Sequence, residues 1–108
     1  MVSGERIVSP EVTIVPTPGH TPGHQSVIVA SAGQRAFIAG DVAHNPAQAN
    51  ETEWNAGADG DGPLAAATRK RVMERLEQDG SVAVFGHFPA PGFGRLVREG
   101  GRRIFREL

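Results

Sequence analysis

The pattern of apolar and polar positions predicts three strands in the first forty residues. Residues 11–17 (EVTIVPT) are rich in β-branched side chains and end at prolines, which cannot donate the hydrogen bonds of a sheet. Residues 25–31 and 35–40 are nearly continuous apolar runs on either side of a short turn, and they predict a hairpin. Because neither run alternates, we expect both of these strands to be buried on both faces.

The second half of the chain predicts one helix and three further strands. Residues 63–80 begin with a proline, end at a glycine and repeat apolar side chains at helical spacing. Residues 81–86 (SVAVFG) predict a short buried strand, and residues 95–105 predict a hairpin around a Gly-Gly turn. The expected fold is a single α/β (α+β) domain over residues 1–108, with a mixed β-sheet, one main helix and the order β-β-β-α-β-β-β.

Composition and charge exclude several classes of function. The 108 residues carry a formal net charge of −1, so no basic surface for nucleic acid is indicated. No apolar run reaches the length of a membrane span, and the first residues lack the apolar core of a signal peptide. We therefore expect a cytoplasmic protein without nucleic-acid or membrane partners. The chain has no cysteine, which leaves His, Asp and Glu as its strong metal ligands.

Residues 17–24 read TPGHTPGH and follow directly on a predicted strand. Proline restricts φ and glycine allows backbone conformations closed to other residues, so such a stretch is suited to hold a side chain in one place. The pattern fits a metal ligand or catalytic base at His20 or His24. It also fits an exposed loop with two solvated histidines.

Polar residues stand at the ends of three predicted strands, namely His20, Asp41 and His87. Residues at the ends of neighbouring strands meet at one edge of a sheet, where sites in α/β proteins are commonly built. Two imidazoles and a carboxylate form a ligand set for a hydrolytic metal centre. His24 and His44 lie close to these positions in sequence, and they suit the orientation of a ligand or contact with a substrate.

Three segments, TPGHTPGHQSVIV, AFIAGDVAHNP and VAVFGHFPAPGFGRL, together resemble the metallo-β-lactamase-fold hydrolases, especially lactonase-like and organophosphate-hydrolase-like members. The resemblance implies that His20 binds a first metal ion, Asp41 bridges two ions and His87 binds the second. It implies that His44 lies beside a small-molecule substrate. It also implies Zn²⁺ as the cofactor, with Mn²⁺ or Fe²⁺ as alternatives, and a metal-activated water that attacks an ester, lactone, amide or phosphoester.

The sequence lacks one motif of that family. The His-x-His-x-Asp-His loop of its N-terminal half does not occur, and no His-x-His is present. The resemblance is thus to the C-terminal half of an αββα sandwich, and we expect little hydrolase activity from this chain alone. The alternative is a non-catalytic, truncated half-fold that binds metal weakly or serves as a protein-interaction module.

Half of a sandwich would expose one apolar face of its sheet. Soluble monomers seldom expose so much contiguous apolar surface, so we expect either a homodimer through this face or cover by a missing N-terminal half. The side chains expected there are Val12, Ile14, Val27, Val29, Phe37, Ile38, Val82 and Val84.

Overall fold

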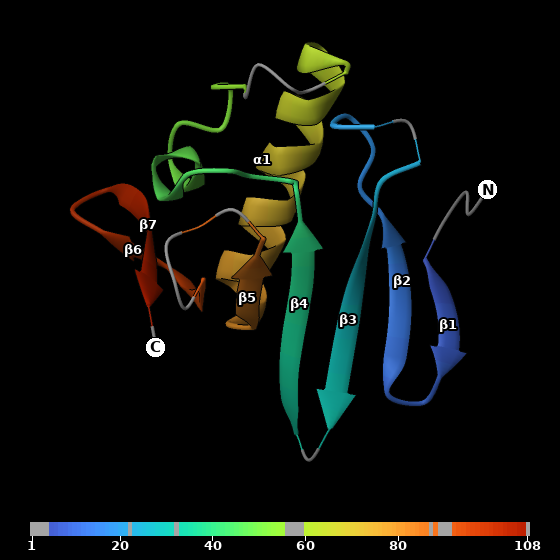
Figure 1. Cartoon of the computed structure of the whole chain (residues 1–108). Coiled ribbons are helices and arrows are strands. Elements are labelled where there is room, and N and C mark those ends of the chain that lie inside the picture. The colour runs from blue at the N-terminus through green and yellow to red at the C-terminus, as the bar shows by residue number, and fades with distance from the viewer. Residues whose placement is uncertain are drawn as a thin grey trace.

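The computed structural model describes residues 5–21, 23–31, 33–55, 60–86, 88 and 92–107. Within these residues, seven strands form one sheet in chain order, and one α-helix lies against one face of it (Figure 1). Strands β4 and β5 run parallel and the other neighbouring pairs are antiparallel. The elements are β1 (Arg6–Ser9), β2 (Val12–Pro16), β3 (Gln25–Ser31), β4 (Gln34–Gly40), the 3₁₀ helix η1 (Pro46–Ala49), α1 (Gly62–Asp79), β5 (Val82–Phe85), β6 (Phe93–Glu99) and β7 (Arg102–Glu107).

The structure confirms both predicted hairpins, the helix and the mixed sheet, but it adds a strand at the start. The predicted order lacked β1, which pairs antiparallel with β2 at the edge of the sheet. This strand has only four residues, and its Ile7 and Val8 are 75% and 58% exposed. The alternation of buried and exposed positions that marks a strand is therefore missing from this segment.

Local signals at both ends explain where α1 begins and ends. The Asp61 carboxylate accepts a hydrogen bond from the Leu64 amide at 3.0 Å and so caps the first turn. Gly80 takes the left-handed conformation, with φ of 65°, and its amide donates to the Leu76 carbonyl. No helix in the described part of the chain is long and apolar enough to cross a membrane.

The expectation that β3 and β4 are buried on both faces is wrong. Phe37 is buried while Ile38, the next residue, is 43% exposed, and Ile28 is buried while Val29 is 36% exposed. The reason is that α1 covers only one face of the sheet (Figure 1). Phe37 therefore belongs to the core and not to the outer apolar face on which the sequence placed it.

The face of the sheet opposite α1 carries two rows of apolar side chains, here called the outer face. Strand register places the members of each row side by side on successive strands. Within the described residues no helix covers these rows, and the homodimer through this face stays a prediction. The first row is Ile14, Val27, Ile38, Val84 and Phe93, and the second is Val12, Val29, Ala36 and Val82.

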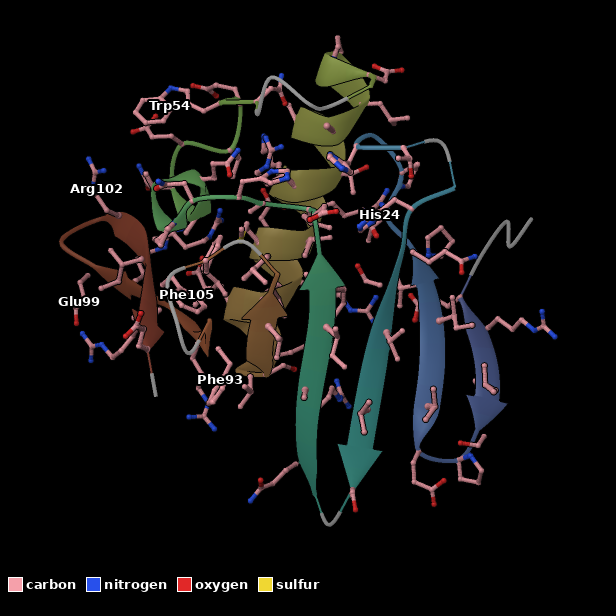
Figure 2. All side chains as sticks on the ribbon, viewed as in Figure 1. His24, Trp54, Phe93, Glu99, Arg102 and Phe105 are labelled. Atoms are coloured by element: carbon pink, nitrogen blue, oxygen red, sulfur yellow. The ribbon has the colours of Figure 1, made fainter. Side chains whose placement is uncertain are left out.

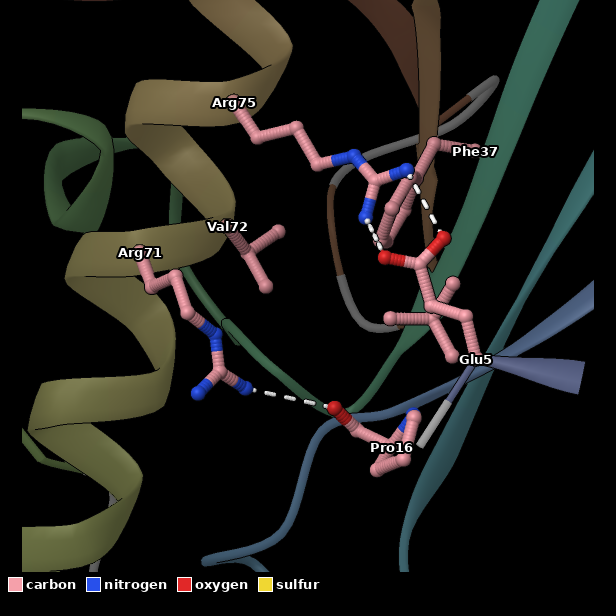
Figure 3. Close-up of a pocket in the computed structure, with 7 residues that line it drawn as sticks. Glu5, Pro16, Phe37, Arg71, Val72 and Arg75 are labelled. Atoms are coloured by element: carbon pink, nitrogen blue, oxygen red, sulfur yellow. Dashed lines mark hydrogen bonds and ion pairs between the residues drawn. The ribbon is translucent and has the colours of Figure 1, made fainter. Parts of the chain in front are cut away.

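Polar contacts tie the edge of the sheet to α1 around a cavity of about 270 Å³ (Figure 3). The Arg75 guanidinium pairs with both oxygens of Glu5 at 3.0 and 3.2 Å, and it lies 5.9 Å from the centre of the Phe37 ring. Arg71 donates to the Pro16 carbonyl at 3.2 Å. Two arginines of α1 thus hold β2 and the residue just before β1 to the helix.

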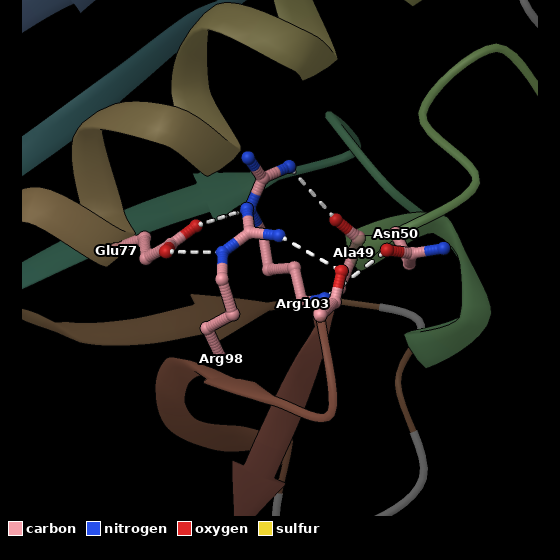
Figure 4. A network of polar contacts seen from close by, with 6 residues as sticks. Ala49, Asn50, Glu77, Arg98 and Arg103 are labelled. Carbon is pink, nitrogen blue, oxygen red and sulfur yellow. Dashed lines mark hydrogen bonds and ion pairs between the residues drawn. The ribbon is translucent and has the colours of Figure 1, made fainter.

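A second polar network joins α1 to the β6–β7 hairpin and to η1 (Figure 4). The Glu77 carboxylate accepts hydrogen bonds from Arg98 at 2.9 and 3.0 Å and from Arg103 at 2.8 Å. Arg103 also donates to the Ala49 carbonyl at 3.0 Å, and its amide donates to Asn50 Oδ1 at 3.1 Å. These hydrogen bonds, from Arg98 first and then Arg103, lower the pKa of Glu77 from 4.5 to about 2.

We expect this pair of arginines to make the stability of the fold depend on Glu77 ionisation. The pKa is lower in the folded chain, so the contribution is present above pH 4.5 and is lost as the pH falls toward 2. Glu77→Gln should have a lower urea midpoint than the parent at pH 7, and the difference should shrink at pH 2.5. Glu74→Gln, an exposed site on the same helix, is the control. Equal midpoints of parent and Glu77→Gln at pH 7 would contradict the prediction.

Candidate metal centre

His20 lies on a loop that is bound to the N-terminal end of α1. The loop turns at Gly19, where φ is 139°. The amides of Gly60 and Asp61 donate to the carbonyls of His20 and Gly19 at 3.0 and 2.9 Å, and the Thr68 hydroxyl donates to Pro18 O at 2.7 Å. These hydrogen bonds to the carbonyls of Pro18, Gly19 and His20 therefore fix the backbone that carries the His20 imidazole.

Asp41 leaves the sheet at the end of β4, where β5 also ends. Gly40 adopts a φ of 56°, and the Val42 amide donates to the Ala39 carbonyl at 3.1 Å, which closes a tight turn around Asp41. The Gly86 amide donates to the Gly40 carbonyl at 3.1 Å, so the ends of the two parallel strands are held together. This turn directs the Asp41 side chain toward the His20 loop.

His44 is placed by the buried side chain of Gln48 in η1. Gln48 Oε1 accepts hydrogen bonds from the His44 amide at 2.6 Å and from the Asn45 amide at 3.0 Å. Gln48 Nε2 donates to the Trp54 carbonyl at 2.5 Å. One amide side chain thus fixes both the backbone at His44 and the later part of the same loop.

His20, Asp41 and His44 form one group of half-buried donors. His20 Nε2 lies 3.4 Å from Asp41 Oδ2, and His44 Nε2 lies 3.8 Å from Asp41 Oδ1. The two imidazole rings are 5.2 Å apart between centres, and one donor atom from each residue lies within 4.8 Å of the other two. Each carboxylate oxygen faces a different imidazole, so Asp41 is the donor that the two histidines share. Two imidazoles and a carboxylate fit zinc by the chemistry of their donors.

The structure brings together two of the three strand-end residues, as predicted, and adds a third donor. His20 and Asp41 meet, whereas His87 lies outside the described residues. His44, which the resemblance places beside the substrate, lies within reach of the same ion as His20 and Asp41. The residue after His87 is Phe88, which is buried and stacks on Phe85 at 4.4 Å between ring centres.

Sequence reasoning missed Arg69, a fully buried guanidinium on α1. Its Nε donates to the Val42 carbonyl at 2.8 Å, and its Nη1 donates to the carbonyls of Thr52 and Trp54 at 2.8 Å each. Arg69 therefore fixes both ends of the loop that carries His44. The helical spacing could have indicated its burial, because Arg69 stands four residues after Ala65 and lies on the buried face of the helix.

A cavity of about 440 Å³ opens beside His44. The indole of Trp54 forms part of its wall, and Figure 2 shows this side chain on the loop that follows η1. The other lining residues are Asn45, Ala47, Gln48 and Asn55. The cavity and the donor group share His44, so a molecule held against Trp54 would lie next to the donors.

Comparison with known proteins decides the family of the chain. The family model of the metallo-beta-lactamase superfamily matches residues 2–87. The chain belongs to this superfamily. Two curated relatives are N-acyl homoserine lactonases, from Bacillus sp and Bacillus cereus, which are 28% and 27% identical over 108 residues. The match covers 99% of this chain and 40% of each relative.

Solved structures of the superfamily share the fold. AidC, described as a dizinc quorum-quenching lactonase, superposes with a TM-score of 0.87 at 22% identity, over 95% of this chain and 35% of AidC. The hydrolase AbOPH superposes with a TM-score of 0.86 at 26% identity, over 97% of this chain and 36% of AbOPH. The chain thus matches well under half the length of these superfamily members.

Proposed function

We propose that this chain supplies part of the zinc site and of the substrate pocket of a hydrolase that opens a lactone. The observation that carries the proposal is the donor group of His20, Asp41 and His44, with Asp41 turned toward both imidazoles. Membership of the metallo-beta-lactamase superfamily and the lactonase relatives support it.

The residues of this chain would bind the ion through imidazole nitrogens and a carboxylate. When bound, zinc lowers the pKa of water to about 7 and polarises the bond under attack. His20 would bind the ion through a neutral imidazole nitrogen, Asp41 would add a negative charge beside it, and His87 is a further proposed ligand. His44 has its backbone fixed by Gln48, so its imidazole can bind the ion or orient the substrate without rearrangement of the loop.

The cavity beside His44 indicates which part of the substrate this chain contacts. Gln48 uses both ends of its amide for protein hydrogen bonds, and Asn45 Oδ1 accepts from the Ala47 amide. The rest of the lining includes the apolar side chains of Trp54 and Ala47, together with His44 and Asn55. An apolar arm attached to a lactone ring would suit this surface.

We further propose that the chain alone has little catalytic turnover. It spans 40% of the length of its lactonase relatives, and its sequence has no His-x-His from which the remaining ligands could come. Purified chain with added Zn²⁺ should hydrolyse an N-acyl homoserine lactone, a β-lactam and a phosphotriester no faster than buffer does. Robust turnover that His20→Ala abolishes would contradict this part of the proposal.

Zinc binding tests the donor group directly. We expect Zn²⁺ to change the fluorescence of Trp54, the single tryptophan of the chain, and to give a measurable heat of binding by calorimetry. His20→Ala or Asp41→Asn should weaken the affinity by about 10-fold or more, because each removes one of few strong ligands. Glu53→Gln, on the exposed part of the loop, is the control. Unchanged affinity in both His20→Ala and Asp41→Asn would overturn the proposed site.

A further inference from the structure

His24 lies between the loop that carries His20 and the turn that carries Asp41. Its Nε2 accepts a hydrogen bond from the backbone amide of Asp41 at 3.1 Å. On the other side of the ring, Nδ1 lies 3.1 Å from the Thr17 carbonyl oxygen and 2.9 Å from the Thr17 hydroxyl. Figure 2 labels His24 beside the ends of β3 and β4.

These partners allow one protonation state of the ring. A backbone amide can only donate, so Nε2 must offer its lone pair to Asp41. A carbonyl oxygen can only accept, so Nδ1 must carry the proton that faces Thr17. His24 is therefore the neutral tautomer with its proton on Nδ1, and both nitrogens are engaged within the protein.

The surroundings of His24 are built to hold this ring in place. Thr17 is 2% exposed and Ser26 is 0% exposed, and their hydroxyl oxygens lie 2.8 Å apart. The Thr17 amide also donates to the His24 carbonyl at 3.0 Å. At Gly40 an added Cβ would stand 3.2 Å from His24 Nε2, so glycine allows the ring to approach the turn closely.

We propose that His24 is a positioning residue for the metal centre and does not bind the ion itself. The inference rests on the proposed zinc site. His24 links the Asp41 amide to the Thr17 carbonyl. Thr17 directly follows β2, where the loop that carries His20 begins, so the ring fixes the Asp41 backbone to this loop. The lone pair that would bind zinc is the one already given to Asp41. This explains why the second histidine of the Pro-Gly-His repeat stands apart from the donor group although its ring centre is 6.2 Å from that of His20.

The tautomer can be measured without any reference to activity. In a long-range ¹H–¹⁵N spectrum of labelled chain, His24 should show a protonated Nδ1 and an unprotonated Nε2, both without metal and with saturating Zn²⁺. A protonated Nε2 in the metal-free chain, or a His24 Nε2 signal that moves to the position of a zinc-bound nitrogen, would overturn the proposal.

Two variants separate positioning from general stability. His24→Phe keeps a planar ring but offers no acceptor, and we expect its zinc affinity to fall about 10–100-fold. His24→Gln can place Oε1 near the former Nε2 and should recover most of that loss. The Asp41 amide resonance should shift strongly in the Phe variant and little in the Gln variant. Circular dichroism identifies a temperature at which both variants are folded.

Asn50→Ala is the matched control, because it removes the hydrogen bonds to the Arg103 amide and the Glu51 carboxylate, further along the same loop. It should lower stability and leave both the zinc affinity and the Asp41 resonance unchanged. A folded His24→Phe variant with parental zinc affinity would overturn the proposal. If the parent itself bound no zinc, the proposed function would fail, and the tautomer and the Asp41 resonance would still decide the role of His24.

Discussion

Gly19→Ala is expected to destabilise the fold severely, whereas Gly23→Ala, at the equivalent place in the second half of the repeat, is expected to be nearly neutral. A Cβ at Gly19 would stand 2.3 Å from Ala65 Cα and 2.5 Å from Ala65 N, both in the backbone of α1. At Gly23 a Cβ meets nothing within 4 Å. The two halves of TPGHTPGH thus have different structural requirements.

The size of the effect follows from two separate costs. The φ of 139° at Gly19 is open to glycine and strained for alanine, at about 1–3 kcal/mol. The clash with α1 forces a backbone shift, which costs roughly another 1–3 kcal/mol. Urea unfolding of the parent and both variants measures the loss. Similar midpoints for Gly19→Ala and Gly23→Ala would show that the loop does not lie against α1 as described.

The Gly19 variant should also lose zinc affinity at temperatures where it remains folded. The carbonyls of Gly19 and His20 accept hydrogen bonds from the residues just before α1, so a shift of the loop away from the helix moves the His20 imidazole as well. Gly23→Ala should bind zinc like the parent.

Arg69→Met should have an equally large effect through a different mechanism. The substitution keeps most of the side-chain volume but leaves the carbonyls of Val42, Thr52 and Trp54 without the donors that Arg69 supplies. Leaving a buried carbonyl without its hydrogen-bond donor costs about 1–3 kcal/mol. Arg69→Lys should recover only part of this, because one ammonium group cannot match the planar fork that reaches three carbonyls.

The control and the readout for Arg69 are both available in the same region. Lys70→Met changes the next, exposed residue of α1 and should stay within about 0.5 kcal/mol of the parent. The fluorescence of Trp54 should change in Arg69→Met before global unfolding, because the Trp54 carbonyl loses a donor. Equal stability of Arg69→Met and Lys70→Met would contradict the structural role given to Arg69.

The sequence predicts those parts of the fold that depend on local signals. Pro63 and Gly80 mark the ends of α1 within one residue, and the Gly-Gly turn places the last hairpin correctly. His20 and Asp41 could be found because each follows a strand at a Pro-Gly or Gly step, and strand ends gather at one edge.

What the sequence could not predict depends on contacts between distant segments. The burial of Phe37 and the exposure of Ile38 follow from the position of α1, which packs on one face of the sheet. The role of His24 depends on an amide 17 residues away, and that of Arg69 on carbonyls 15 to 27 residues away. Periodicity carries no information about such pairings.

The outer face of the sheet has a thermodynamic consequence for the chain on its own. Val29, Ile38 and Phe93 keep 36%, 43% and 41% of their surface in contact with water after folding. The heat capacity change of unfolding scales with the apolar area newly exposed, so it should fall below the usual value of about 12–15 cal/mol/K per residue. The stability curve should then be flatter, with a broad calorimetric transition. Conversely, association that covers this face should show a large negative heat capacity change of binding.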